Sequence, residues 1–241
     1  MTFKLDLLPA IEDLKRVDVE GQPRVYQRGD RIYRSVTSVL SKLDGSWLEE
    51  WKRAVGQDKA AAISKAALAR GSMVHSLCES YLKGQDMSKI LPIHKEDFRK
   101  AKQLLDKYLG TVKGIEHQLY SDTMEAAGTA DLLGEWGDLL QEQNRKMSII
   151  DFKTSKKQIR KDTLQKYFLQ LGCYANMVEE IYKIHIPRLV IVSIEAEHPV
   201  PVQYVISGSH TEKYKAKARQ FMLSTLPKKE LHGDNYQGQV S

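Results

Sequence analysis

The sequence predicts an α/β fold with a helical N-terminal extension. Helical periodicity dominates the first 110 residues, and three apolar strands joined by short polar turns follow. An amphipathic helix, two further strands and a last helix complete the chain. This β-β-β-α-β order within 241 residues favours a single α/β core with a helical cover. Two separate domains are less compatible with it.

The N-terminal part is expected to contain a hairpin and several helices. Residues 24–40 alternate in polarity around a turn at Gly29 and Asp30, which predicts a hairpin, and Ser35 or Thr37 then caps a short helix. Gly71 lies inside the expected helix 57–83, which either continues through the glycine or breaks there. The expected helices are 46–55, 57–83 and 95–109.

The C-terminal part is expected to form the sheet. Its strands are predicted at 112–120, 127–135, 147–153, 188–196 and 202–206, and its helices at 162–184 and 209–224. The tail 226–241 is polar and contains glycine, which predicts fraying.

Composition excludes several classes of protein. Hydrophobic residues make up 41% and charged residues 28%, as in an ordinary globular protein, and the net charge of +6 favours anionic partners such as nucleic acid. Cys78 and Cys173 form no CxxC pair, which excludes zinc fingers and four-cysteine iron–sulfur clusters. There is no apolar run of about 18 residues and no secretory signal, so we expect no membrane partner and a cytoplasmic location, in a bacterium or a phage-infected cell.

Two aspartates point to a metal site. Asp131 follows small residues in AAGTADLLGEW, and Asp151 lies on the next predicted strand, so the sheet can bring them together. Adjacent carboxylates repel each other and suit a hard cation such as Mg²⁺. The alternative is that both are ordinary turn acids at strand ends.

Lys153 strengthens the metal interpretation. It lies two residues after Asp151, where the strand is expected to end, so both side chains share one face. An amine there can polarise a water molecule or stabilise a phosphate charge; a solvated ion pair is the alternative. The following basic run favours a phosphate track or, alternatively, a solvated face: Lys156, Lys157, Arg160 and Lys161.

Two helical pairs add further candidates. His75 and Glu79 share a helix face and offer one nitrogen and one oxygen to a metal, or form an exposed helix contact. Gln170 and Tyr174 lie beside the apolar stripe of the helix 162–184. They can contact a phosphate or a base, or form a polar fringe of the core.

Together these motifs resemble the PD-(D/E)XK nucleases. More narrowly, they resemble the RecB-like exonuclease branch, which includes the mitochondrial genome maintenance exonuclease and its phage relatives. The resemblance runs from about residue 35 to 197. Ala130 replaces the proline of the family label, and the four-cysteine cluster of some RecB-like relatives is absent. The motifs, in order, are Gly71-x-x-x-His75, Gly128-Thr129-Ala130-Asp131, Asp151-Phe152-Lys153-Thr154 and Gln170-Leu171-x-x-Tyr174-Ala175.

The resemblance implies a restriction-endonuclease-like core, a central mixed sheet flanked by helices, in one nuclease domain. Residues 1–110 would form the hairpin and helical cover, 111–225 the catalytic core and 226–241 a flexible tail. The implied ligands of Mg²⁺ or Mn²⁺ are His75, Asp131, Asp151, the Phe152 carbonyl and Glu116, with Glu79 as a further candidate. The implied catalytic residues are Asp131, Asp151, Lys153, Gln170 and Tyr174.

The resemblance also implies a passage for single-stranded DNA under the helical cover. The expected DNA contacts are Arg70, Lys156, Lys157, Arg160, Gln170 and Tyr174. The implied function is a monomeric exonuclease of replication, recombination or repair that prefers single-stranded ends. The alternatives are a flap or structure-specific endonuclease of the same fold, and a non-catalytic nucleic-acid-binding module.

Overall fold

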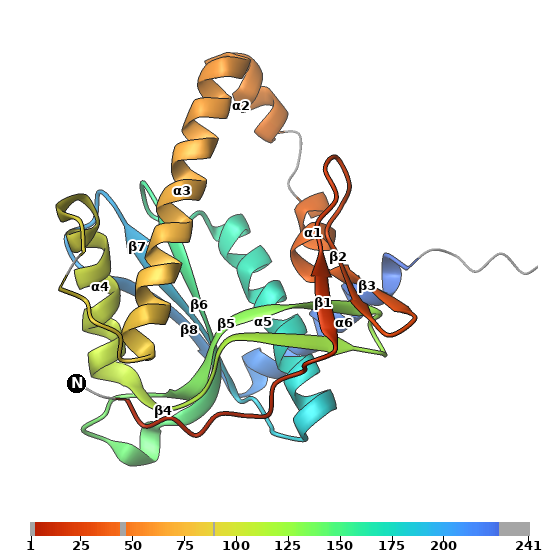
Figure 1. Cartoon of the computed structure of the whole chain (residues 1–241), viewed down its shortest axis with the longest axis vertical. Helices are drawn as coiled ribbons and strands as arrows, with labels where there is room; N and C mark the ends of the chain where they lie inside the picture. The colour runs from red at the N-terminus through yellow and green to blue at the C-terminus, as the bar shows by residue number, and fades with distance from the viewer. Residues whose placement is uncertain (1–2, 44–46, 89, 227–241) are drawn as a thin grey trace, which may run out of the picture.

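The structure is a computed structural model that describes residues 3–43, 47–88 and 90–226. A mixed eight-stranded sheet is flanked by helices on both faces (Figure 1), so the predicted α/β fold with a helical N-terminal region is confirmed. The strands are β1 (Leu14–Val17), β2 (Val25–Arg28), β3 (Arg31–Ser35), β4 (Leu109–Ser121), β5 (Ala126–Trp136), β6 (Lys146–Ser155), β7 (Arg188–Glu195) and β8 (Val202–Ser207). The helices are α1 (Val36–Leu40), α2 (Trp47–Val55), α3 (Gln57–Leu82), α4 (Pro92–Tyr108), α5 (Lys161–Tyr182) and α6 (Ser209–Ser224).

Two hydrophobic cores lie on opposite faces of the sheet. Successive strand residues point to opposite faces. Ile149 therefore packs into the core that contains α1, α5 and α6, and Ile150 packs into the core that contains α3 and α4. Leu189 and Val190 of β7 divide in the same way. The central strands are buried on both sides, which is why they read as continuous apolar runs.

The helix α3 stands out from the sheet and carries α2 at its far end (Figure 1). It passes through Gly71 without a break. Arg70 anchors it: the guanidinium forms two hydrogen bonds to Asp97 of α4, of 2.7 and 2.8 Å, and donates to the carbonyl oxygens of Ser155 and Ile194. These contacts join α3 to α4, β6 and β7.

The strand β5 has a divided edge. One edge pairs with β4 along most of its length. The other pairs with β3 at residues 126–127 and with β6 at residues 132–136. Between them, residues 128–130 pair only with β4 in the described chain, so the sheet forks at the Gly-Thr-Ala-Asp motif.

The strand β1 was not predicted from the sequence, and most of the predicted tail lies outside the described residues. β1 was not predicted because its sequence, Leu-Lys-Arg-Val, carries two charges and is too short to show alternation. The predicted cap is confirmed at Ser35, whose Oγ accepts a hydrogen bond from the Ser38 N–H. The predicted flexible tail lies outside the described residues, except for Leu226. No helix within the described ranges is long and apolar enough to cross a membrane.

We predict that Gly172→Ala lowers the free energy of unfolding by about 1–3 kcal/mol. A Cβ atom on Gly172 would lie 2.8 Å from the Tyr214 carbonyl oxygen of α6, so the two helices would have to separate. Urea unfolding followed by circular dichroism measures the change. Gln165→Ala, on the exposed side of α5, is the control and should change stability little; equal effects of the two substitutions would contradict the close helix contact.

Candidate active site

Three carboxylates lie in a row across three strands at the fork. The register pairs Leu132 with Ile150, which sets Asp131 opposite Asp151 at the point where the β5–β6 ladder stops. The β4–β5 register likewise sets Glu116 opposite Asp131. Like charges directly opposite each other on neighbouring strands destabilise a sheet, so this row needs compensating positive charge.

The Asp131 side chain stabilises the fork between β5 and β6. The Phe152 N–H donates a hydrogen bond of 2.8 Å to Asp131 Oδ2, where a regular ladder would have a backbone acceptor. The carboxylate therefore completes the hydrogen bonding of β6 while β5 turns away. The sequence predicted that the strand ends at Asp151 and Lys153. This was wrong, because β6 continues to Ser155 and both residues lie within it.

Lys153 and α5 engage Asp151. Lys153 Nζ lies 2.7 Å from Asp151 Oδ2, so the two side chains do share one face. Gln170 Nε2 donates to Asp151 Oδ1 at 3.0 Å. The Lys153 ammonium also lies 4.8 Å from the centre of the Tyr167 ring. The helix α5 thus fixes both the acid and the amine of β6.

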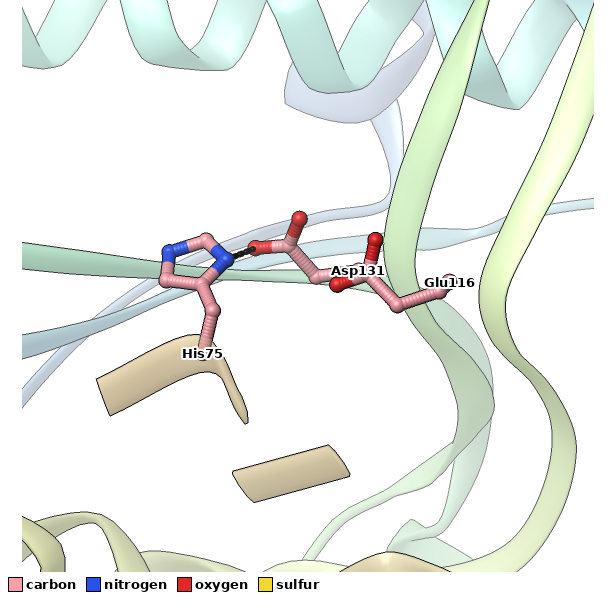
Figure 2. A group of neighbouring side chains, drawn as sticks. All are labelled: His75, Glu116 and Asp131. Carbon is pink, nitrogen blue, oxygen red and sulfur yellow. Dashed lines mark ion pairs between the residues drawn. The ribbon is translucent and has the colours of Figure 1, made fainter. Parts of the chain in front are cut away.

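His75 of α3 closes the cluster from the other side (Figure 2). Its Nδ1 lies 3.5 Å from Asp131 Oδ2, and its Nε2–H donates to the Phe152 carbonyl oxygen at 2.8 Å. One ligand atom each from His75, Glu116 and Asp131 lie within 4.8 Å of one another. Glu79, one turn after His75, pairs instead with Lys83 at 2.6 Å.

The electrostatics fit a divalent cation. Burial, reinforced by the charge of Asp151, raises the pKa of Asp131 to about 7. Burial also raises the pKa of Glu116. For Lys153 burial lowers the pKa, but the charges of Asp151 and Asp131 outweigh it and the net pKa is raised, so it is an ammonium at neutral pH. One lysine does not balance three acids, and a mixed oxygen and nitrogen donor set suits Mg²⁺ or Mn²⁺.

The cluster opens into a groove of about 800 Å³, here named the α3 groove. One face of α3 forms a wall with Ser64, Leu68, Ser72 and His75, which lie three or four residues apart. Arg16 of β1 also lines the groove. Glu116, Phe152, Lys153 and Thr154 line it as well. The cluster is therefore reachable from solvent.

Tyr174 lies behind the site. Its side chain is only 2% exposed and packs against Gly128 of the fork. A Cβ atom on Gly128 would lie 2.7 Å from Tyr174 Cε1, so the glycine is needed for this contact. Burial raises the pKa of Tyr174 well above its usual range, which keeps its hydroxyl neutral. The contact gives Tyr174 a supporting position; its predicted contact with DNA stays a prediction.

The predicted DNA-binding cations lie outside the residues that line the α3 groove. Arg70 is engaged with Asp97 and backbone carbonyls, which favours a structural role. Lys156 lies 3.7 Å from Glu197, and Lys157 lines a separate hollow with Glu195, Glu197 and His198. Arg160 precedes α5 and lies 3.7 Å from Asp162. Their binding roles stay predictions.

Two residues of the site were not found from the sequence. Tyr167 lies three residues before Gln170 on the same helix. This i, i+3 spacing places both on one helix face, so the sequence contained a signal for Tyr167. Arg16 reaches the groove only because the hairpin folds toward α3, and nothing in its local sequence indicates this.

The geometry agrees with the comparison to known families. A family model described as the PD-(D/E)XK nuclease superfamily matches residues 47–237, well over half of the chain. The match spans every residue of the cluster and begins at α2, so it leaves out the β1–β3 hairpin and Arg16. Comparison with curated proteins gave no match.

We predict that Asp131→Asn stabilises the metal-free protein by about 1–4 kcal/mol at pH 8. Because the pKa of Asp131 is raised to about 7, its cost to folding accumulates as the pH rises from about 4 to about 7 and is complete above that. Urea unfolding in EDTA should therefore show a smaller gain at pH 5 than at pH 8. Asp162→Asn, an exposed control, should change little; a gain at pH 5 equal to that at pH 8 would contradict the buried charge.

We also predict that Gly128→Ala and Tyr174→Ala are strongly coupled. Gly128→Ala alone should cost about 1–3 kcal/mol, because the new methyl group meets the Tyr174 ring. In the double variant that clash is absent, so the total cost should fall below the sum of the two single costs. Additive costs in urea unfolding would show that the ring and the glycine do not constrain each other.

Proposed function

The chain belongs to the PD-(D/E)XK nuclease superfamily, and from this we propose that it is a metal-dependent DNA exonuclease that prefers single-stranded ends. The observation that carries the proposal is the row of acids with Lys153 beside the α3 groove. Membership of this superfamily indicates that the chain is a hydrolytic nuclease. The order of the Gln170 and Tyr174 motif after Lys153 supports the RecB-like branch, and we propose a role in replication, recombination or repair.

The walls of the α3 groove suit one strand of nucleic acid. Small polar side chains such as Ser64 and Ser72 leave room beside α3, and Leu68, which is 72% exposed, offers an apolar surface to a base. Arg16 supplies a positive charge for a phosphate, although it is paired with Asp18 at 2.6 Å. A groove of about 800 Å³ accommodates a short segment of one strand more readily than a duplex.

His75, Glu116 and Asp131 would hold the divalent cation, with Asp151 and the Phe152 carbonyl beside them. The cation would supply a Lewis acid for the scissile phosphate and would lower the pKa of a bound water molecule. Loading requires His75 Nε2 to give up its hydrogen bond to the Phe152 carbonyl or to bind through Nδ1.

Lys153 would act as a fixed positive charge and hydrogen-bond donor. Its raised pKa keeps it protonated, so it orients the attacking water or stabilises the charge on the phosphate and does not act as a base. Gln170 holds Asp151, and Asp151 holds the ammonium. Gln170 therefore positions Lys153 through the acid. The predicted cytoplasmic location and monomeric state stay predictions.

We predict that Lys153→Ala lowers kcat/KM on single-stranded DNA by about 100-fold or more. The measurement uses an end-labelled linear strand and a circular strand, each with Mg²⁺ and with Mn²⁺. The parent should degrade the linear strand only, and EDTA should abolish the reaction. Lys146→Ala, at the opposite end of β6, is the matched control and should keep the parent's activity.

Each other outcome identifies an alternative. Cleavage of the circle would indicate an endonuclease of the same fold. Binding of both strands in EDTA without cleavage under either metal would indicate a non-catalytic module. Full activity of Lys153→Ala would remove the proposed role of the lysine.

A further inference from the structure

A second hollow lies next to the α3 groove. It has a volume of about 340 Å³ and is lined by the N-terminal segment 5–11, by residues 114–118 of β4 and by Lys83 at the end of α3. This volume is near the lower end of the range for small-molecule pockets, about 300–1,000 Å³. We name it the end hollow. It suits one small group and not a length of strand.

The hollow forms between β4 and the N-terminal segment that runs along it. The segment first pairs with the strand: the Val112 N–H donates to the Lys4 carbonyl, and the Leu8 N–H donates to the Lys113 carbonyl at 2.8 Å. Past Leu8, the Tyr182 hydroxyl donates to the Pro9 carbonyl at 2.6 Å and holds the segment near α5. Leu5, Leu7 and Leu8 line the end hollow from the paired stretch, and Ala10 and Ile11 line it from beyond the Tyr182 contact. Both attachments therefore hold its outer wall.

The end hollow and the α3 groove meet at the metal cluster. Glu116 lines both of them. Glu79 lines the groove, Lys83 lines the hollow, and these two side chains form an ion pair of 2.6 Å across the boundary. A phosphate at the cluster would therefore have the groove on one side and the hollow on the other.

The two spaces differ in chemistry. The groove wall carries serines, His75 and Lys153, which suit a sugar–phosphate backbone, and Leu68 is its exposed apolar side chain on α3. The hollow carries leucines whose side chains are partly open to solvent: Leu5 is 47% exposed and Leu7 is 55% exposed. Apolar side chains of this kind suit the flat face of a nucleobase. Lys83 supplies a positive charge at the mouth.

We propose that the end hollow is the subsite for the terminal nucleoside of the strand, on the far side of the scissile phosphate from the α3 groove. This rests on the proposed nuclease function and deepens it. The strand would lie in the groove, its last phosphate at the cluster and its last base against Leu5 and Leu7. A pocket sized for one nucleoside favours a free end and release of mononucleotides.

The test compares two ligands that differ by the base. Binding of dAMP and of deoxyribose 5-phosphate is measured by calorimetry with Mg²⁺, in the parent and in Ala10→Trp, which adds a bulky ring to an exposed position lining the hollow. The parent should bind dAMP at least about tenfold more tightly than deoxyribose 5-phosphate, and Ala10→Trp should abolish this difference. Leu7→Gln, at an exposed position that tolerates a polar residue, should reduce it.

Val200→Trp is the matched control, because Val200 is 55% exposed in a loop that lines neither space. It should leave the preference for dAMP intact. An unchanged preference in both Ala10→Trp and Leu7→Gln would overturn the subsite, as would equal binding of the two ligands by the parent. If Ala10→Trp does not fold, the dAMP preference of Leu7→Gln alone decides whether the end hollow is the subsite.

Failure of the subsite and failure of the nuclease proposal give different results. Degradation of linear DNA together with an unchanged dAMP preference in the variants would overturn the subsite alone. Loss of the preference in the variants, with no cleavage of DNA by the parent, would support a nucleoside pocket and overturn the exonuclease. In an active parent, Ala10→Trp should also shift the products of an end-labelled strand from mononucleotides to longer fragments.

Discussion

The hydrogen bond from the Phe152 N–H to the Asp131 carboxylate is the interaction on which the site depends. It ends the β5–β6 ladder without leaving the Phe152 N–H unpaired, and it fixes the Asp131 carboxylate between β5 and β6. β6 remains fixed because it pairs with β7 from Ser148 to Ser155. The sheet can therefore fork at residues 128–131 and still present acids at defined positions.

The fork concentrates negative charge that the fold alone does not balance. Glu116, Asp131 and Asp151 lie side by side on three strands, where neighbouring like charges oppose folding. The surrounding structure holds them in place: Gln170 and Lys153 engage Asp151, and His75 approaches Asp131. A partly buried site with excess negative charge is prepared for a cation, at a cost in the stability of the metal-free protein.

The helical cover gives the site two neighbouring spaces of different character. α3 carries His75 into the cluster and presents small side chains to the groove above it. Arg70 fixes the angle of α3 through Asp97 and two backbone carbonyls, so it acts on the groove without lining it. The N-terminal segment pairs with β4 and forms the outer wall of the other space.

The sequence by itself determined the element order from β2 onward, because strand and helix periods are local, but it did not reveal β1. It also determined the proximity of Asp151 and Lys153, because an i, i+2 spacing on a strand allows only one face. Tertiary structure decided the rest. The family resemblance implies DNA contacts at Arg70 and in the basic run from Lys156, and these stay predictions. Where these side chains lie was decided by the packing of α3 and of the loop after β6. Tyr174 was expected beside the apolar stripe, either in contact with DNA or as a polar fringe of the core. Its side chain is buried, and only the fold brings Gly128 against its ring. Contacts between distant segments depend on register and packing, and no local pattern records them.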